Sequence, residues 1–361
     1  MVSTSDLKKY GFFAVRDSGP PSDGGNYTTL VIFHGFGWHS AVFAKFFPLV
    51  ADLNVRLVTV NRRDYPGSTP LSAAERKQLD NISELQDKDL AAKALKEYMK
   101  NEAKKVHDFL VKYVSEEDIP VEGGIIMAGW SFGMATILGF LANIEGFSTN
   151  EVELCAYIKH AVLYDGPYHT LGFPPHPDGY NPLFDPALAP GEGPRIFPGW
   201  ISGYYSHGED LTKLEFRDAL PEPRPTILSM DPSEVHACLE LGPTLPGGSD
   251  DRLLMLGIKL GVFAQVRDEV AYLTEKKIVT DNDGEEEVDK EWNNLALRYV
   301  WCDQSAWEMP WGKFCLEAEL EEGKKAGKML RKIEMVRLKG GNHFYHWDQP
   351  ELALKALLSG R

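Results

Sequence analysis

The chain has 361 residues, of which 43% are apolar and 25% are charged, and this composition excludes extensive disorder and indicates a folded globular protein. Its formal net charge of −15 at pH 7 would repel the phosphate backbone of a nucleic acid and the surface of an anionic membrane. We therefore expect neither a nucleic acid nor a membrane as a partner.

The first half of the chain alternates between two patterns. Short apolar runs predict strands at residues 27–33, 55–60, 124–128 and 158–163. Apolar residues three or four positions apart predict helices over residues 39–53, 90–113 and 134–141. Because buried strands that alternate with helices indicate βαβ units, we expect an α/β fold with a mostly parallel sheet flanked by helices.

This alternation stops after residue 166. The next segment, residues 167–292, is rich in proline, glycine and aromatic residues. It contains two predicted helices, at 232–241 and 250–273, and a charged run at 281–289 that predicts a solvated loop.

The strand and helix signals then resume at residues 295–301, 313–325, 333–338 and 350–358. We therefore predict a core formed by residues 1–166 and 293–361. The segment 167–292 is predicted to be a largely helical cap, or lid, inserted between two strands of the sheet.

Gly129-Trp130-Ser131-Phe132-Gly133 fits the pattern G-x-S-x-G, with an apolar strand before it and a helix after it. The glycines permit a sharp turn that lifts Ser131 out of the sheet as a nucleophile, and the helix N-terminus directs amide dipoles at an anion formed there. A glycine-rich turn with a capping serine has the same residues, but the flanking strand and helix favour the nucleophile.

Two further glycine-containing segments follow predicted strands. In His34-Gly35-Phe36-Gly37, the chain can fold back so that a backbone N–H faces the nucleophile. An acyl-transfer oxyanion needs two such donors, and we assign them to the N–H groups of Phe36 and Phe132.

In Gly340-Gly341-Asn342-His343, a histidine follows the last predicted strand and can take the serine proton and return it to the leaving group. His346 is the competing histidine. We prefer His343 because it follows the glycine pair, where the backbone is least encumbered.

Together these motifs, with the loop Asn61-Arg-Arg-Asp-Tyr-Pro-Gly-Ser68, resemble the α/β-hydrolase superfamily, of the kind with a cap between sheet strands. The resemblance covers roughly residues 25–166 and 293–360, and the cap matches nothing that we can name. It implies an α/β-hydrolase fold and a Ser-His-acid triad, with no metal and no organic cofactor.

The acid is where the chain departs from the family pattern. Relatives usually carry Gly-x-x-Asp after the strand that follows the cap, and here Ser305 takes the place of that aspartate. We predict that Asp303, two residues earlier, orients His343. Asp165, after the strand that precedes the cap, is the alternative, and Glu308 is a third candidate.

A serine nucleophile excludes the mechanism of epoxide hydrolases and dehalogenases, which use a carboxylate at the same turn. The chain is therefore predicted to be a serine esterase or lactonase that cleaves an ester, lactone or related acyl bond of a medium-sized, largely apolar small molecule. The alternatives are an acyltransferase, C–C hydrolase or lyase with the same triad, and a non-enzymatic ligand-binding protein of this fold. The pocket is predicted to include Trp38, Tyr168, Trp200 and Tyr204.

Three features predict a cytoplasmic location. The N-terminal residues contain no apolar run typical of a secretory signal, and no apolar stretch reaches the roughly 20 residues that span a bilayer. Widely spaced cysteines are typical of reduced thiols rather than of disulfides or a zinc site. The cysteines are Cys155, Cys238, Cys302 and Cys315.

Overall fold

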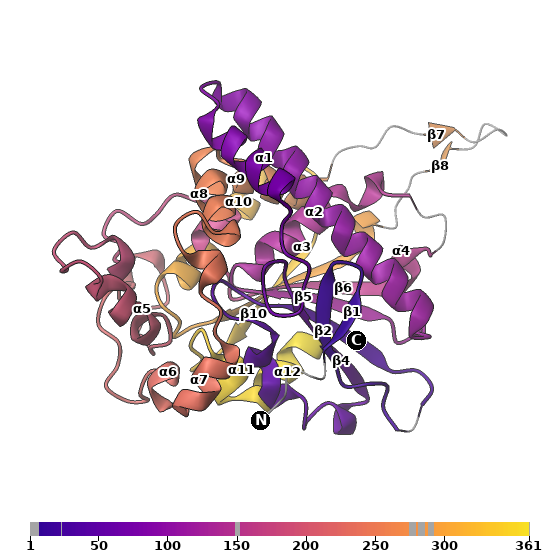
Figure 1. Ribbon diagram of the computed structural model, residues 1–361, viewed down its shortest axis with the longest axis horizontal. Coiled ribbons are helices and arrows are strands. Elements are labelled where there is room, and N and C mark those ends of the chain that lie inside the picture. Colours follow the sequence, from indigo (N-terminus) through magenta and orange to yellow (C-terminus); the bar gives the residue numbers. More distant parts are fainter. Residues whose placement is uncertain are drawn as a thin grey trace.

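The structure is a computed structural model that describes residues 7–22, 24–148, 152–273, 279–280, 286–287 and 292–360. Its centre is an eight-stranded sheet in the order β1-β2-β4-β3-β5-β6-β9-β10 (Figure 1). The strands are β1 (Lys8–Tyr10), β2 (Phe13–Asp17), β3 (Thr28–Phe33), β4 (Val55–Asn61), β5 (Ile125–Trp130), β6 (Ile158–Tyr164), β9 (Ala296–Cys302) and β10 (Ile333–Leu338).

The sheet is mostly parallel. Strand β2 is antiparallel to both β1 and β4, and every other neighbouring pair in the sheet runs parallel. Strands β3, β4 and β5 are buried along their whole length, as expected for a sheet covered on both faces. The predicted α/β fold is therefore confirmed.

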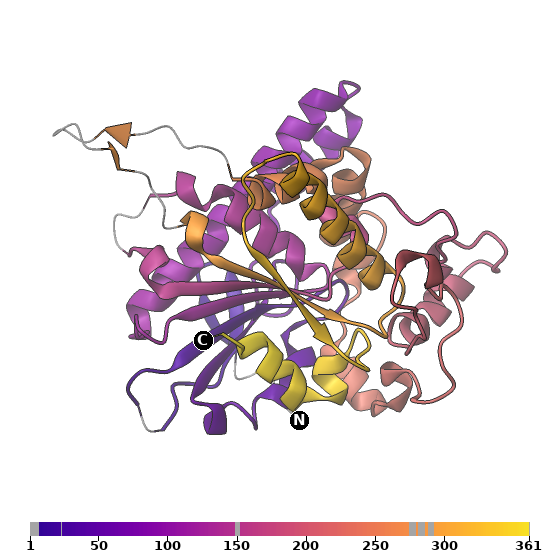
Figure 2. The same ribbon diagram turned by 180° about the vertical axis from the view of Figure 1, so that it is seen from behind.

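Helices cover both faces of the sheet because successive strand residues point to opposite sides. Val31 and Phe33 of β3 pack with α2 (Lys88–Glu116) and α3 (Gly133–Asn143), whereas Leu30 and Ile32 pack with the 3-10 helix η2 (Ser40–Phe46) and α12 (Pro350–Leu358). The two views from opposite sides show α12 on one side of the sheet and α2 on the other (Figures 1 and 2). The remaining core helices are α1 (Ala73–Glu84), the short α4 (Leu154–Tyr157), α10 (Glu308–Lys325) and α11 (Tyr345–Asp348).

Two predicted helices differ from the observed ones, and one observed helix was not predicted. The helix expected over residues 39–53 is replaced by η2 and a second 3-10 turn, η3 (Ala51–Leu53), because Pro48 lacks the N–H that a continuous helix needs. The helix expected over 250–273 is divided at Gly261, which has φ 65°, into α8 (Ser249–Lys259) and α9 (Val262–Ala271). Helix α1 was not predicted, although Ser72 and Glu75 form a capping box at its start.

The segment between β6 and β9 contains several helices and 3-10 turns. Its helices are α5 (Glu192–Ile201), α6 (Thr226–Ser229), α7 (Pro232–Cys238), α8 and α9. Helix α9 buries Val262, Phe263 and Val266 in the same cluster as α2 and α3. Within the charged run at 281–289, the structure describes only β8 (Glu286–Glu287), which pairs with β7 (Val279–Thr280). The rest of this run, and with it the loop prediction, lies outside the described residues.

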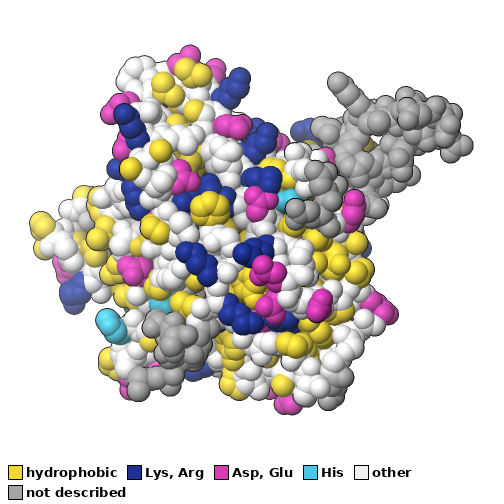
Figure 3. Space-filling view, turned by 45° about the vertical axis from the view of Figure 1, so that its right-hand side comes forward, with side chains coloured by type: hydrophobic (Ala, Val, Ile, Leu, Met, Phe, Trp, Pro, Cys, Tyr) yellow, Lys and Arg dark blue, Asp and Glu magenta, His cyan; other side chains and the backbone are white. Residues whose placement is uncertain are grey.

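The surface mixes charges of both signs. On the face in Figure 3, Lys and Arg side chains are interspersed with Asp and Glu and do not gather into one basic stripe. Among the helices of the described part, none is long and apolar enough to cross a bilayer.

Candidate active site

The candidate nucleophile lies on a strained turn between β5 and α3. Ser131 has φ 54°, and its N–H donates to the Tyr164 carbonyl oxygen at 2.9 Å. The flanking glycines are required by close packing. A Cβ on Gly129 would lie 2.4 Å from the Gly133 carbonyl oxygen, and one on Gly133 would lie 2.6 Å from that of Phe33. A left-handed serine costs about 1–2 kcal/mol, so the surrounding packing must hold it in place.

His343 contacts Ser131 directly. The His343 Nε2 atom is 3.0 Å from Ser131 Oγ. His343 follows β10 and the turn at Gly340, which has φ 72°. The His343 carbonyl oxygen accepts a hydrogen bond from Trp130 Nε1 at 3.0 Å. The ring is buried, and it lies against Trp130 with 4.9 Å between ring centres.

Asp165 is the carboxylate that contacts His343. Its Oδ2 atom is 2.8 Å from His343 Nδ1 and also accepts from Ser305 Oγ at 2.6 Å, while Oδ1 accepts from the Cys302 N–H at 2.8 Å. Asp165 is fully buried and has φ 46°, so the chain turns sharply at the end of β6 and directs the carboxylate toward β9 and β10. Ser131, His343 and Asp165 therefore form one hydrogen-bonded series.

The prediction that Asp303 orients His343 is wrong. Asp303 Oδ2 binds Arg337 Nε at 2.8 Å, and Oδ1 accepts from the Gly340 N–H at 2.7 Å. Its own N–H pairs with the Leu338 carbonyl oxygen, so the turn after β9 holds Asp303 at the start of the loop that carries His343. Asp303 is thus a support for that loop and does not reach the imidazole.

The other candidates for the acid and the base also lie elsewhere. Glu308 Oε1 accepts from Asn181 Nδ2 at 3.0 Å and does not contact His343. His346 is fully buried among Phe43, Trp130 and Phe344, and neither ring nitrogen has a hydrogen-bond partner among the described residues. Burial holds the pKa of His346 well below its usual value, so the ring is neutral.

The loop after β3 packs directly on the nucleophile. A Cβ on Gly35 would lie 2.7 Å from Ser131 Cβ and 3.1 Å from Ser131 Oγ, so only glycine fits there. The N–H groups of Phe36 and Phe132, the predicted oxyanion donors, bond to no other group among the described residues. Their rings pack edge to face, with 5.9 Å between ring centres.

The comparisons with known proteins identify the family of the chain. Residues 30–356 match the model of a family described as the alpha/beta hydrolase family. The chain belongs to this family. No significant match is found among curated protein sequences.

Solved structures also resemble this α/β-hydrolase at low sequence identity. A laboratory-evolved variant of a potato epoxide hydrolase is 13% identical, with a TM-score of 0.50 over 98% of this chain and 95% of that chain. An epoxide hydrolase from metagenomes of hot environments is 16% identical, with a TM-score of 0.44 over 98% and 99%. A thermophilic esterase from Thermogutta terrifontis is 13% identical, with a TM-score of 0.39 over 96% and 91%.

A buried polar network holds the loop after β3 in place. This segment, residues 34–37, carries the predicted donor Phe36 and is called the oxyanion loop below. Arg62 donates through Nη1 and Nη2 to both oxygens of Asp250, at 2.6 and 2.5 Å, and through Nη2 to the Gly35 carbonyl oxygen at 2.8 Å. Tyr65 donates its OH to Asp250 Oδ2 at 2.6 Å and accepts from the Gly37 N–H at 3.0 Å. The residues on both sides of Phe36 are therefore fixed by a network that reaches helix α8.

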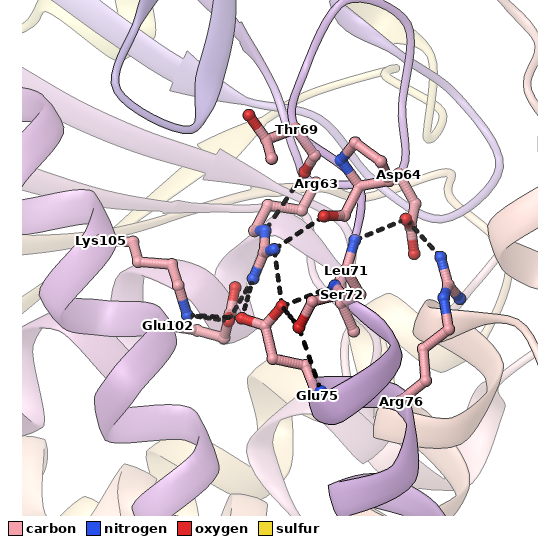
Figure 4. A network of polar contacts seen from close by, with 10 residues as sticks. Arg63, Asp64, Thr69, Leu71, Ser72, Glu75, Arg76, Glu102 and Lys105 are labelled. Atoms are coloured by element: carbon pink, nitrogen blue, oxygen red, sulfur yellow. Dashed lines mark hydrogen bonds and ion pairs between the residues drawn. The ribbon is translucent and has the colours of Figure 1, made fainter.

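The next arginine has a different role. Arg63 binds Glu75 Oε1 and Glu102 Oε1, at 2.5 and 2.9 Å, and Lys105 joins the same carboxylates (Figure 4). This network ties the loop after β4 to α1 and α2 and contains no residue of the oxyanion loop. His34 belongs to the Arg62 network. Burial and the neighbouring Arg62 hold the pKa of His34 well below its usual value, so the ring is neutral. Its Nε2 atom can therefore accept a hydrogen bond from the backbone N–H of Arg62, at 2.9 Å.

A cavity of about 740 Å³ opens over Ser131 and His343. This is within the roughly 300–1,000 Å³ typical of small-molecule sites. Of the four predicted pocket residues, Trp38 and Tyr168 line the cavity. Trp200 and Tyr204 are buried and do not line it. Trp200 Nε1 donates to the Phe216 carbonyl oxygen, and Tyr204 OH donates to Asp348 Oδ2.

The cavity has polar lining that was not predicted as part of the pocket. Glu308 is predicted only as a candidate acid for the triad, and Asn181 is not among the predicted site residues, yet both line the cavity. Neither Glu308 nor Asn181 has a sequence signature of its own, because the two residues meet only when residues 167–292 fold. Among the residues that the structure describes, no group of His, Cys, Asp and Glu could hold a metal ion.

Proposed function

We propose that the protein is a serine hydrolase that cleaves an ester, lactone or related acyl bond of a medium-sized, largely apolar small molecule. The observation that carries this proposal is the Ser131–His343–Asp165 series, which opens into a mostly apolar cavity. The strained turn at Ser131 and the glycine contact at Gly35 support it, because both leave Oγ accessible to a substrate carbonyl.

The proposed reaction has two halves. Ser131 Oγ attacks the substrate carbonyl carbon while His343 Nε2 takes the hydroxyl proton, and the oxyanion accepts hydrogen bonds from the N–H groups of Phe36 and Phe132. His343 then gives the proton to the leaving oxygen as the scissile bond breaks, leaving an acyl ester on Ser131. A water molecule, deprotonated by His343, releases the acid and restores the serine.

Asp165 is the acid in this proposal. Its contact with Nδ1 fixes the tautomer in which Nε2 is free to accept the serine proton, and its negative charge stabilises the imidazolium that forms. The hydrogen bonds from Ser305 and Cys302 hold the carboxylate in one orientation. Ser131 offers no carboxylate for an alkyl-enzyme ester, so the resemblance to epoxide hydrolases does not extend to that mechanism.

A panel of p-nitrophenyl esters from acetate to decanoate, with a matched set of lactones, tests the proposal. We expect hydrolysis of at least one member by the wild-type protein, and a loss in kcat of about 10³-fold or more in Ser131→Ala. His346→Ala is the control histidine variant and should lose far less than His343→Ala. Absence of hydrolysis across the panel, or a Ser131→Ala variant as active as the wild type, would contradict it.

A further inference from the structure

The cavity contains one buried carboxyl group that the proposed reaction does not use. Asp185, Asp251 and Glu308 all line the cavity, and only Glu308 is buried, with 6% of its surface exposed. The other lining residues are mainly aromatic and aliphatic. Removing a carboxyl group from water is costly unless a partner compensates it, so its position in an apolar cavity calls for an explanation.

Glu308 is only half satisfied by the protein. Asn181 Nδ2 donates to Oε1 at 3.0 Å, and Asn181 is itself held by the Leu183 N–H, which donates to its Oδ1 at 2.9 Å. The second oxygen, Oε2, has no hydrogen-bond partner among the described residues and is not sealed off by the surrounding side chains. One oxygen is thus positioned by the protein, and the other remains available in the cavity.

We propose that Glu308, positioned by Asn181, forms a polar subsite that binds a hydroxyl group of the substrate, so that the preferred substrate is a hydroxylated ester or lactone. This inference rests on the proposed serine hydrolase function. A hydroxyl group is favoured because it can donate to a carboxylate and accept from a carboxylic acid. A cationic amine would have to lose its own water in a cavity with apolar walls.

The ionisation of Glu308 gives the subsite a pH dependence. Burial raises the pKa of Glu308 to about 7, against the opposing effect of the Asn181 hydrogen bond. Tyr168 and Tyr205 interact electrostatically with Glu308, and burial raises the pKa of both phenols, so they stay neutral. The other titratable groups that line the cavity are His169, Tyr180, Asp185, Arg217, Asp251 and His343. Because an ionised acceptor makes the stronger hydrogen bond, selection for the hydroxyl group should increase from pH 6 to pH 8.

The test compares p-nitrophenyl octanoate with its 6-hydroxy, 8-hydroxy and 8-amino derivatives. We expect the wild-type protein to favour a hydroxylated ester by about 10–100-fold in kcat/KM, the range of one hydrogen bond to a charged group. In Glu308→Leu this ratio should fall to one or below. Glu308→Gln, which keeps the shape and an acceptor oxygen, should retain part of the ratio but lose its pH dependence. Asp251→Asn, at another lining carboxylate, should keep the wild-type ratio.

The outcomes are separable from those of the proposed function. Because each ratio is taken within one variant, a general loss of activity cancels. If Ser131 fails to react with a fluorophosphonate, the proposed function fails. If Ser131 reacts and octanoate is hydrolysed, then equal rates for all esters, a preference for the amine, or an unchanged ratio in Glu308→Leu would overturn the subsite alone.

Discussion

At the scale of single residues, the sequence motifs predict Ser131 and His343, which lie in contact, but not Asp165 as the carboxylate that contacts His343. Ser131 and His343 have glycine neighbours at strand ends, and those neighbours are visible in the sequence. Asp165 depends on a left-handed turn at an aspartate, and an aspartate at a strand end gives no sign of such a turn. Ser305 stands where relatives carry the acid, and its hydroxyl donates to Asp165 and helps to hold it.

The assignment of the acid can be tested with two matched variants. Asp165→Asn would favour the wrong tautomer of His343, and kcat should fall by up to about 10⁴-fold, the loss that the equivalent change causes in the chymotrypsin-type triad. Asp303→Asn keeps an acceptor for the Gly340 N–H and loses a half-exposed pair with Arg337, which is worth about 1 kcal/mol or less. Its kcat should stay close to that of the wild type. Steady-state rates on one p-nitrophenyl ester decide between them, and a larger loss in Asp303→Asn would return the role to that residue.

At the scale of elements, the strands and long helices follow from apolar periodicity, whereas the breaks depend on single residues. Pro48 and Gly261 interrupt two predicted helices, and the capping box at Ser72 starts a helix that periodicity missed. The contact between α8 and the oxyanion loop could not be predicted, because Arg62 and Asp250 are 188 residues apart and meet only in the folded chain.

The Arg62–Tyr65–Asp250 network should matter for the rate more than for binding. Tyr65→Phe removes the acceptor of the Gly37 N–H and frees the loop that carries Phe36. We expect kcat to fall by roughly 10–100-fold, less than the 10²–10³-fold loss of an oxyanion donor itself, with little change in KM.

Glu75→Gln is the matched control for this network. This change breaks the bidentate pair between Glu75 and Arg63. Because the Arg63 network contains no residue of the oxyanion loop, kcat should stay near the wild-type value. Steady-state kinetics at a temperature where both variants are folded make the comparison. A change confined to KM in Tyr65→Phe, or equal kcat losses in the two variants, would contradict a positioning role.

At the scale of the whole molecule, the loss of βαβ alternation after residue 166 predicts where an inserted segment begins. Its attachment to the core was not predictable, because that depends on which helix faces pack together. Helix α9 buries Phe263 against the core, with 6.3 Å between the ring centres of Phe263 and Phe132, beside the nucleophile. Helix α9, near the end of residues 167–292, is therefore part of the main core.

This packing predicts how the insertion contributes to stability. Phe263→Ala should lower the free energy of unfolding by about 3–5 kcal/mol, the usual cost of truncating a buried phenylalanine. Met255→Ala, on the exposed side of α8, should cost far less. Urea denaturation followed by circular dichroism measures both. Equal, small effects would mean that α9 contributes little to the stability of the core.

The most direct test of the whole account is covalent labelling of the nucleophile. Intact-protein mass spectrometry after treatment with a fluorophosphonate should show one adduct per chain, peptide mapping should place it on Ser131, and Ser131→Ala should show none. Labelling of Asp165→Asn should be much slower than that of the wild type, because the base is no longer held in the reactive tautomer. An adduct on another residue, or labelling of Ser131→Ala at the wild-type rate, would contradict the assignment of this site as a serine hydrolase.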